Sequence, residues 1–467
     1  MFNFTENTQK VINILIENNL TPIFVGGFVR DALISNIHGL KIKNKDIDIE
    51  VFGETNMDKL KEILEPLGKV IIAGKSFGVL KLWIENEDFD ISLPRKEKNK
   101  GIRHKDLVVD IDPKISFKEA FKRRDLTINA IGFNIKENVF IDEFNGINDI
   151  KTKTIKVVDN NTFIEDPLRL LRAIGFAVRF NFKIEEKSKI LLKSMVDKNM
   201  LSNILKERIF TEWKKFLLKS EKPSKAIMIM KEIGLLEKNF SEISNLINIK
   251  QDPKWHPEGD VFVHTLMVLN EMSKLLKESK LNENDKVALL FAAITHDFGK
   301  VKTTKLINGK ITSHNHEREG VEIAKNFMKK ITNEKDVIEK VLLLTEFHLF
   351  PLIAIDGKIK LSTFKKIHKK IDLELLAIMA VADKKGRGFE FDGKPLMKMM
   401  LSKKEEIENI EKNKDKLSIS GKDLINHGLK PSKVFSILLE ELNDIFDPEQ
   451  DNKDEVIKTF LTARKLI

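Results

Sequence analysis

The sequence contains no cysteine and no tyrosine in 467 residues. Without cysteine the chain forms no disulfide, carries no thiolate nucleophile and builds no cysteine-ligated zinc site, so any metal must be held by histidine, aspartate or glutamate. No stretch approaches the roughly 18 uninterrupted apolar residues of a transmembrane helix. The first ten residues also lack the basic flank and apolar run of a secretory signal. We therefore expect a cytoplasmic protein without membrane association.

Arginine is scarce as well, and its distribution is uneven. The net charge of +10 is a modest excess that favours a polyanionic partner, yet only 12 of the 81 lysine and arginine residues are arginine. Nine of them lie between residues 30 and 208: Arg30, Arg95, Arg103, Arg123, Arg124, Arg169, Arg172, Arg179 and Arg208. A planar guanidinium makes bidentate contacts to phosphate or base edges that lysine cannot make. We interpret this region as a binding region, the alternative being helices that carry arginine without a binding role.

Hydrophobic periodicity separates a mixed amino-terminal part from a helical remainder. Residues 1 to about 145 predict a small sheet with flanking helices, with strands expected at 21–25, 46–51, 69–72, 79–84 and 89–91. From about residue 150 the apolar spacing is helical, with breaks near 251–259 and 386–395. We expect an α+β protein in four parts: a head at 1–145, a helical neck and body at 146–250, a histidine-rich helical domain at 251–386 and a helical tail at 387–467.

Paired carboxylates give the first candidate site. Asp46 and Asp48 alternate along an expected strand, so their side chains project from one face. Two carboxylates that share a face repel each other unless cations lie between them, and two-metal phosphoryl transfer uses such hard oxygen ligands. The alternative is an acidic, solvent-exposed strand face. Asp90, on a strand that could pack beside the pair, is a candidate third carboxylate.

Two further features suit a nucleotide. Gly26 and Gly27 lie between an apolar strand and a helix, where the backbone can approach an anion closely, and Arg30 follows within one turn. Asp166 followed by proline predicts the start of a helix, with the acid as N-cap. Asp166 and Arg169, at i and i+3, would offer one acceptor and one forked donor on the same helix turn.

Four motifs in order resemble those of the bacterial tRNA nucleotidyltransferase and poly(A) polymerase family. They are Gly26-Gly27-Phe28-Val29-Arg30-Asp31, Asp46-Ile47-Asp48, Arg123-Arg124-Asp125-Leu126-Thr127-Ile128-Asn129-Ala130 and Glu165-Asp166-Pro167-Leu168-Arg169-Leu170-Leu171-Arg172-Ala173. The resemblance covers about residues 20 to 385. It implies a polymerase-β-like nucleotidyltransferase head, followed by a helical neck that binds the nucleotide base and RNA.

The resemblance also implies roles for particular residues. Asp46 and Asp48 would bind Mg²⁺ and align a terminal ribose hydroxyl with the α-phosphate of a nucleotide, with Asp90 as the third catalytic candidate. Nucleotide contacts would come from Gly26, Gly27, Arg30, Arg124, Asp125, Asn129, Asp166, Arg169 and Arg172. Asp166 and Arg169 would read the edge of cytosine or adenine. Gly175 stands where the family usually has a further arginine.

Histidine marks a second candidate site, since six of the ten histidines lie between residues 256 and 348. The His296-Asp297 pair ends an expected apolar helix, and its surroundings resemble the HD phosphohydrolase domain found in one branch of the same family. The resemblance implies that a divalent metal of unassigned identity is bound by His264, His296, Asp297 and Asp383, with His316 and His348 as secondary candidates. A cation held in this way fits phosphatase or cyclic phosphodiesterase activity. The alternative is a helical bundle without catalysis.

The resemblance as a whole implies an enzyme that adds or repairs the 3′-terminal CCA of tRNA from CTP and ATP without a nucleic-acid template. The tRNA 3′ end, CTP and ATP are the expected partners, and no protein partner is implied. The shared motifs do not separate this function from that of a poly(A) polymerase or of an enzyme that adds only CC or only A. Because Gly175 replaces the family's usual arginine, a phosphohydrolase whose transferase head has lost its activity is a further alternative. The carboxylate pair argues against a non-catalytic RNA-binding protein.

Overall fold

The computed structural model describes residues 2, 4–40, 42, 46–54, 56–74, 78–99, 107–417, 419–432, 434–446, 451–464 and 466. The chain forms two compact units, Met1–Glu346 with Ala382–Phe389 and Phe347–Val381 with Glu390–Ile467. One mixed sheet and many helices confirm the expected α+β class. The division into four parts at residues 145, 250 and 386 stays a prediction.

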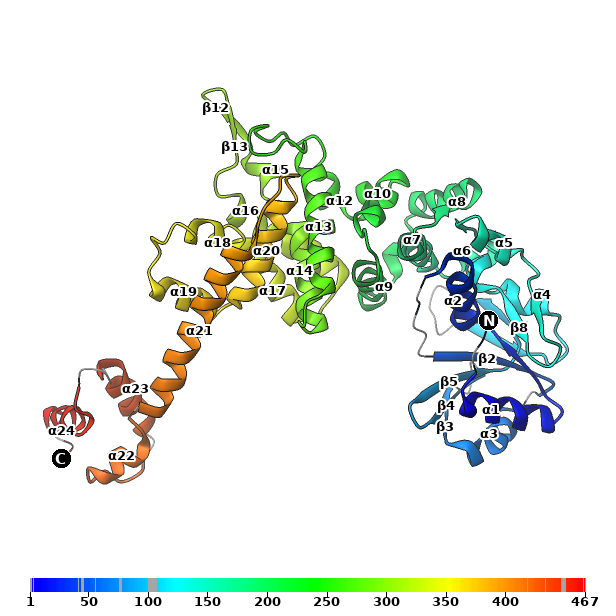
Figure 1. Ribbon diagram of the computed structural model, residues 1–467, viewed down its shortest axis with the longest axis horizontal. Coiled ribbons are helices and arrows are strands. Elements are labelled where there is room, and N and C mark those ends of the chain that lie inside the picture. The colour runs from blue at the N-terminus through cyan, green and yellow to red at the C-terminus, as the bar shows by residue number, and fades with distance from the viewer. Residues whose placement is uncertain are drawn as a thin grey trace. The chain divides into compact units, whose positions relative to one another are not determined.

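A seven-stranded sheet in the order β3-β4-β5-β2-β1-β8-β9 forms the head (Figure 1). Its strands are β1 Thr21–Phe24, β2 Asp46–Phe52, β3 Lys69–Gly74, β4 Val79–Ile84, β5 Glu87–Ser92, β8 Gly132–Asn134 and β9 Val139–Ile141. The pairing of β2 with β5 is parallel and the other pairings are antiparallel. Because β2 and β5 pair in register, residues that share one face of β2 lie beside residues that share the same face of β5.

Six helices surround this sheet: α1 Glu6–Glu17, α2 Gly26–His38, α3 Met57–Leu64, α4 Phe117–Lys122, α5 Gly146–Lys151 and α6 Asn160–Ile164. Helices α1 and α3 lie on one face of the sheet and α2 lies on the other (Figure 1). The alternation along β2 explains this arrangement, since Ile49 and Val51 are fully buried on one face while Asp46, Asp48 and Glu50 share the opposite face. The head therefore has one apolar face and one face that carries acids.

The remaining described strands form three short two-stranded sheets. They are β6 Arg95–Asn99 with β7 Leu107–Ile111, β10 Thr154–Ile155 with β11 Lys183–Ile184, and β12 Lys305–Ile307 with β13 Lys310–Thr312.

The neck is built from α7 Arg169–Phe180, α8 Glu186–Asp197, α9 Lys206–Lys219, α10 Ser224–Glu232, α11 Leu235–Asn239 and α12 Ser241–Ser244. Trp213 on α9 is fully buried, with its ring 5.0 to 5.9 Å from the rings of Phe216, Phe240, Phe291 and Phe327. Phe291 and Phe327 belong to the helices that follow the neck. One aromatic core thus joins α9 to the histidine-rich part of the same unit.

That part of the first unit contains α13 Val261–Lys277, α14 Glu283–Thr295, α15 Lys300–Thr303, α16 His316–Ile331 and α17 Lys335–Phe347. Helix α14 is buried along its whole second half, from Val287 to Thr295, so it forms the centre of the bundle. Among the described helices, none has both the length and the apolar character that crossing a bilayer requires.

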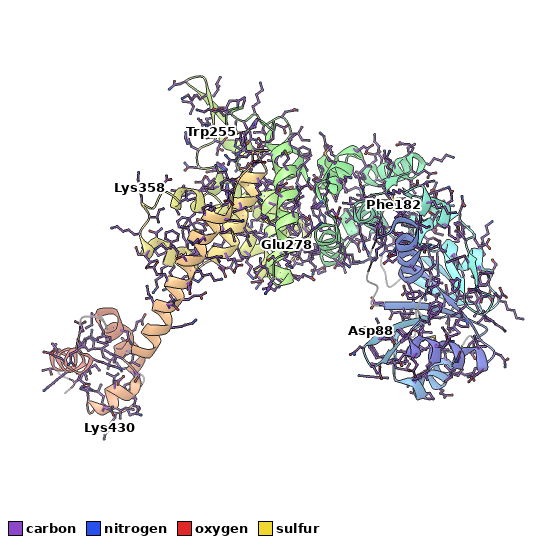
Figure 2. All side chains as sticks on the ribbon, in the orientation of Figure 1. Asp88, Phe182, Trp255, Glu278, Lys358 and Lys430 are labelled. Atoms are coloured by element: carbon purple, nitrogen blue, oxygen red, sulfur yellow. The ribbon has the colours of Figure 1, made fainter. Side chains whose placement is uncertain are left out.

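The second unit contains α18 Phe350–Ala354, α19 Leu361–His368, α21 Lys394–Leu417, α22 Gly421–Asn426, α23 Phe435–Ile445 and α24 Lys453–Ala463, and α20 Leu373–Lys385 runs from it into the first unit. Within it, Lys404 on α21 donates to Asp372 over 2.6 Å. Helices α22 to α24 close around a separate core that includes Leu424, Leu442 and Leu461. Side chains of both units, including Lys358 and Lys430 of the second, are drawn in Figure 2.

The five expected strands of the head all form, with ends that differ by at most two residues. Strands β6 to β9 were not expected, because they are short or irregular in their apolar pattern. The helix expected from Asp166 begins three residues later, at Arg169. The Asp166 carboxylate still accepts from the Leu168 amide over 3.2 Å, so it stabilises the turn that leads into α7 instead of capping the helix itself.

Gly175 yields a test of this fold, because it lies inside α7 and a Cβ built there would meet only the Cβ of Phe216, at 4.0 Å. We expect Gly175→Ala to raise the free energy of unfolding by about 0.5–1 kcal/mol, since alanine fits the space and restricts the unfolded chain. Urea denaturation followed by circular dichroism measures the change.

Gly234 is the matched control, with equally open surroundings but a φ of +78°. Gly234→Ala should lower the stability, because L side chains rarely adopt that conformation. A loss of stability in both variants would contradict the packing described for α7.

Candidate functional site

A cavity of about 490 Å³ opens on the acidic face of the head sheet. Its lining comes from β2, β5, the first residues of β4 and β6, the start of α2, the segment after α4, and helices α7 and α9 with the turn before α7. The residues are Val25, Gly26, Gly27, Arg30, Asp48, Val79, Asp90, Ser92, Arg95, Arg123, Arg124, Asp125, Asn129, Asp166, Leu168, Arg169, Arg172 and Arg208. Segments far apart in the sequence therefore meet around one space.

Two carboxylates lie next to each other at the floor of this cavity. The parallel register pairs Asp48 of β2 with Asp90 of β5 and Asp46 with Asp88, which Figure 2 labels. Burial raises the pKa of Asp48, and Asp90 raises it further, while Arg124 acts in the opposite direction. Lys81 pairs with Asp90 over 2.9 Å. Asp46 is exposed at the first residue of β2 and does not belong to the described cavity lining.

The two glycines at the start of α2 allow this approach. Gly26 has a φ of +65°, and a Cβ built on it would lie 2.8 Å from Oδ2 of Asp48, so a side chain does not fit there. The Gly27 amide donates to the same oxygen over 3.2 Å. The backbone at the start of α2 thus orients Asp48 toward the cavity.

A fully buried acid, Glu50, holds two of the guanidinium groups. It lies on the same face of β2 as Asp48, and its Oε1 accepts from Arg123 over 2.9 Å, while its Oε2 lies 3.6 Å from Arg124. Burial lowers the pKa of Arg124, and Glu50 opposes that shift. Because like charges repel, the two neighbouring arginines need such a partner to stay inside the protein.

A hydrogen-bonded chain links α2 to α7. Arg30 donates to Asn129 over 2.7 Å, Asn129 donates to Asp125 over 2.8 Å, and Arg172 donates to the other oxygen of Asp125 over 2.7 Å. Burial raises the pKa of Asp125, but Arg172, Asn129 and Arg169 outweigh burial and lower it to about 2. Arg30 also lies 4.8 Å from the ring of Phe176. These residues are therefore fixed before any ligand binds.

Helices α7 and α9 supply the remaining wall. Asp166 pairs with Arg208 over 2.9 Å. Arg169 donates to the carbonyl oxygens of Thr162 and Arg123 over 2.8 and 2.7 Å. Asp166 and Arg169 thus line one cavity, and the side chain of each bonds to a different partner.

The charge of the described cavity lining suits a polyphosphate, since seven arginines face four aspartates. Of the other arginines in the cluster, Arg179 lies 3.4 Å from Asp31, and Arg103 lies outside the described residues. Gly175, which stands where the family usually has an arginine, is not part of the described lining. Seven guanidinium groups line the cavity without it.

The acids of this cavity fit a divalent cation. Asp48 and Asp90 lie on adjacent strands in register, and repulsion by Asp90 adds to burial in raising the pKa of Asp48. Hard oxygen donors of this kind bind Mg²⁺ or Mn²⁺. The assignment of Asp46 to the same ion stays a prediction.

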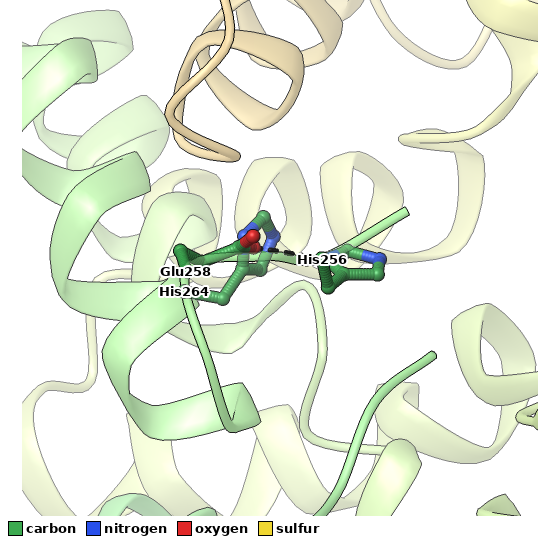
Figure 3. Close-up of side chains that lie close together, drawn as sticks. All are labelled: His256, Glu258 and His264. Carbon is green, nitrogen blue, oxygen red and sulfur yellow. Dashed lines mark hydrogen bonds and ion pairs between the residues drawn. The ribbon is translucent and has the colours of Figure 1, made fainter. Parts of the chain in front are cut away.

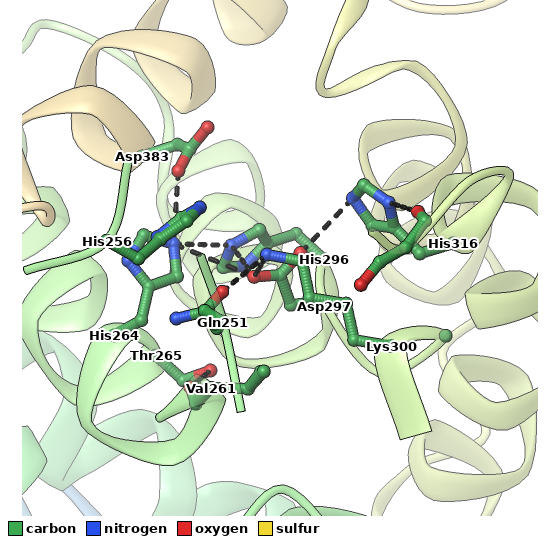
Figure 4. A network of polar contacts seen from close by, with 12 residues as sticks. Gln251, His256, Val261, His264, Thr265, His296, Asp297, Lys300, His316 and Asp383 are labelled. Carbon is green, nitrogen blue, oxygen red and sulfur yellow. Dashed lines mark hydrogen bonds and ion pairs between the residues drawn. The ribbon is translucent and has the colours of Figure 1, made fainter. Parts of the chain in front are cut away.

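The histidine-rich bundle brings the second set of candidates together (Figure 4). Nε2 of His264 lies 3.1 Å from Oδ1 of Asp383, 3.6 Å from Oδ2 of Asp297 and 3.4 Å from Nε2 of His296. Nε2 of His316 lies 3.3 Å from Oδ1 of Asp297. The four residues assigned to the metal are thus neighbours, with His316 beside them.

Local structure explains this arrangement. Asp260 caps α13 by accepting from the Val263 amide, which places His264 in the first turn, and His296 ends α14. Gly299 has no room for a side chain, because a Cβ there would overlap the carbonyl oxygen of His316. The close contact between Gly299 and α16 positions His316 beside Asp297. His348 belongs to the second unit, where it is buried.

Glu258, in the turn before α13, contacts two imidazoles (Figure 3). Its Oε1 lies 2.7 Å from Nδ1 of His264 and 2.9 Å from Nδ1 of His256. Burial raises the pKa of Glu258, but His256 and His264 outweigh burial and lower it to about 2. The opposite nitrogen of His264, Nε2, faces the acids. A metal-binding histidine commonly has a carboxylate beside its second ring nitrogen.

The two buried acids of the bundle have basic neighbours. Lys300 donates to Asp297 over 2.7 Å, and Arg387 donates to Asp383 over 3.1 Å. These cations outweigh burial and hold the pKa of both carboxyl groups well below the usual range. The donor atoms of His264, His296 and Asp297 lie within 4.8 Å of one another, and this mixture of imidazole and carboxylate fits a divalent transition metal.

Sequence reasoning missed Glu50 and Glu258 as members of these sites. The period of two on β2 contained the signal for Glu50, since it places a third acid on the face of Asp46 and Asp48. Glu258 follows His256 by two residues in a turn, and nothing in that spacing indicates that its carboxylate reaches His264. Arg208 was noted only as a member of the arginine cluster.

Three family models match successive parts of the chain. The model of the poly A polymerase head domain matches residues 23–156. The probable RNA and SrmB-binding site of polymerase A matches residues 181–247, and the HD domain matches residues 261–387.

Two curated relatives cover most of the chain. The multifunctional CCA protein of Aliivibrio salmonicida is 33% identical over 399 residues, which make up 83% of this chain and 91% of that protein. The multifunctional CCA protein of Pasteurella multocida is 32% identical over 379 residues, or 78% of this chain and 84% of that protein.

Solved structures share the fold. A CCA-adding enzyme in complex with CTP matches with a TM-score of 0.59 at 20% identity, covering 100% of this chain and 97% of that one. The Thermotoga maritima CCA-adding enzyme complexed with tRNA matches with a TM-score of 0.54 at 20% identity, covering 98% and 94%.

The position of Glu258 yields a test of the metal centre. We expect Glu258→Ala to weaken binding of Co²⁺ or Ni²⁺ by about 10- to 100-fold, because His264 loses the group that orients its ring. Isothermal titration calorimetry of the full chain measures the affinity.

Glu258→Gln should lose less affinity, because its amide oxygen still accepts a hydrogen bond from one imidazole. Removing a neighbouring ring with His256→Ala should cost less than Glu258→Ala. Unchanged affinity in Glu258→Ala would show that this carboxylate does not support the metal site.

Proposed function

This chain belongs to the family of multifunctional CCA proteins, and we propose that it adds or restores the 3′-terminal CCA of tRNA from CTP and ATP without a nucleic-acid template. It is a tRNA nucleotidyltransferase. The observation that carries the proposal is the head cavity, in which the carboxylates of Asp48 and Asp90 face the guanidinium groups of Arg124 and Arg172. The tRNA 3′ end is the acceptor, and pyrophosphate leaves.

The carboxylates of the cavity would hold Mg²⁺, with Asp48 and Asp90 as ligands and Asp46 as a further candidate on the same strand. A divalent cation bound there neutralises charge on the triphosphate and favours attack of the ribose hydroxyl on the α-phosphate. The Gly27 amide keeps Asp48 pointing into the cavity, since it donates to Oδ2. The absence of side chains at Gly26 and Gly27 would let the triphosphate approach the protein backbone at the start of α2 closely.

The guanidinium groups bind and orient the nucleotide. Arg124 lies beside Asp48, with Glu50 behind it, so its charge is directed at the phosphates. Arg30, Asn129 and Asp125 form the hydrogen-bonded chain that ends on Arg172. Asp125 is suited to accept from a ribose hydroxyl, since it stays ionised at neutral pH.

The base would be read on the wall formed by α7 and α9. Asp166 supplies an acceptor for the amino group of cytosine or adenine, and Arg169 supplies donors on the same helix side. The names of the relatives favour CCA addition over poly(A) synthesis or partial addition. The intact carboxylates and arginines of the cavity argue against a decayed transferase head.

A second activity is favoured by the bundle, where His264, His296, Asp297 and Asp383 converge. We propose that this centre holds a divalent transition metal and hydrolyses phosphate esters, as a phosphatase or cyclic phosphodiesterase. The protein supplies the ligands, and Lys300 and Arg387 keep both carboxylates ionised. His316 would be a further ligand from α16, since its Nε2 lies 3.3 Å from Oδ1 of Asp297.

Removal of the carboxylates tests the transferase. We expect Asp48→Ala with Asp46→Ala to lower incorporation of labelled CMP into a tRNA that lacks its CCA by more than about a hundredfold, because the triphosphate loses its cation. Hydrolysis of a 2′,3′-cyclic nucleotide to the nucleoside monophosphate should persist. Continued extension by the double variant would overturn the site assignment.

The reciprocal variant tests the bundle. His296→Ala with Asp297→Ala should abolish metal-dependent hydrolysis of the cyclic nucleotide and leave CCA addition within about twofold of the unmodified protein. A parallel loss of both activities, with the fold intact by circular dichroism, would argue against two separate catalytic centres.

A further inference from the structure

We propose that Arg208 determines nucleotide specificity by holding the carboxylate of Asp166 in one orientation, in which it accepts a hydrogen bond from the amino group of cytosine or adenine. The inference rests on the proposed function, because it concerns the choice among nucleotides that enter the head cavity. Arg208 is a positioning residue, since it acts through Asp166.

The guanidinium of Arg208 comes from a firmly packed element. Arg208 is the third residue of α9, and its Nη2 lies 2.9 Å from Oδ2 of Asp166. The next residues, Ile209 and Phe210, are buried, and Trp213 lies in the aromatic core that joins the neck to the bundle. Helix α9 also packs along α7. The core therefore fixes where the guanidinium can reach.

The carboxylate of Asp166 is held at both oxygens. Oδ1 accepts from the Leu168 amide over 3.2 Å, and Oδ2 accepts from Arg208. An ionised carboxylate has about four acceptor positions, so each oxygen can still accept a donor from a ligand. Both side chains are about one-third exposed, at 30% and 32%, and both line the cavity.

A carboxylate in a fixed orientation selects among bases because it offers only acceptors. Cytosine and adenine carry amino donors at N4 and N6, whereas uracil and guanine carry carbonyl acceptors at the corresponding positions. An acceptor opposite an acceptor is repulsive and leaves both groups without a hydrogen bond. A freely rotating carboxylate could turn away from that contact, but one held at both ends cannot.

The neighbouring arginines of this wall donate their hydrogen bonds to groups other than the Asp166 carboxylate. The guanidinium of Arg169 donates to two backbone carbonyl groups, and that of Arg172 donates to Asp125. Among the described arginines of the cavity lining, Arg208 is the one whose guanidinium bonds to the carboxylate of Asp166. A charge-assisted hydrogen bond of this kind is stronger and more directional than a neutral one.

The test compares Arg208→Ala with the unmodified full-length protein, on a tRNA that lacks its CCA and with each nucleotide supplied separately. We expect the ratio of kcat/KM for CTP to that for UTP to fall by about tenfold or more. The ratio for ATP over GTP, on a tRNA that ends in CC, should fall in the same direction. Arg208→Lys should restore part of the ratio, since an ammonium can still bond Oδ2 but lacks the planar fork.

Arg172→Ala is the matched control, because it removes a guanidinium from the same wall that bonds Asp125. It should lower kcat/KM for CTP and UTP to a similar extent. If Arg208→Ala lowers kcat/KM for CTP and UTP by the same factor, so that their ratio is unchanged, the proposal is wrong. Arg208→Gln preserves more of the side-chain volume and carries the same expectation if the alanine variant is unstable.

A double variant separates direct from indirect action. In an Asp166→Ala background, Arg208→Ala should leave the CTP to UTP ratio unchanged, because there is no carboxylate left to orient. A further fall would assign Arg208 a contact of its own with the base and contradict the positioning role. If the unmodified protein extends no tRNA, the proposed function itself fails, whatever the Arg208 variants do.

Discussion

Two carboxylates on neighbouring parallel strands, Asp48 and Asp90, impose the constraint on which the head depends. The register of β2 with β5 places them together, and their repulsion must be balanced by cations. Arg124 supplies part of that balance from inside the protein, and Lys81 supplies part from the sheet. The glycines at the start of α2 follow from the same constraint, since any side chain at Gly26 would collide with Asp48. A cavity rich in arginine around a pair of acids is suited to bind a metal-complexed triphosphate.

The second centre uses similar physics with different ligands. Asp297 and Asp383 are buried, and each has a basic neighbour within hydrogen-bonding distance. Glu258 orients the ring of His264, because it contacts the ring nitrogen that does not face the acids. Both centres lie in the first unit, and α9 packs against α7, which lines the cavity, and against α14 and α16, which carry histidines of the bundle. The aromatic core around Trp213 therefore supports the walls of both sites.

Much of this organisation was predictable from the sequence, because it depends on short-range periodicity. Alternation on β2 predicted that Asp46 and Asp48 share a face, and the apolar helix before His296 predicted where that histidine lies. The partners of these residues were not predictable, since Glu50, Arg208 and Glu258 acquire their roles through contacts between segments far apart in the chain. The expectation for Asp166 was partly wrong, because the turn at Pro167 delays the helix to Arg169.

In the proposed mechanism, Asp48 and Asp90 together hold a divalent cation against the triphosphate. Anomalous diffraction from Mn²⁺, in crystals of the protein with a non-hydrolysable CTP analogue, would locate that cation. We expect a manganese peak within about 2.5 Å of one carboxylate oxygen of Asp48 and one of Asp90. A nucleotide bound in the cavity without manganese between those two residues would contradict it.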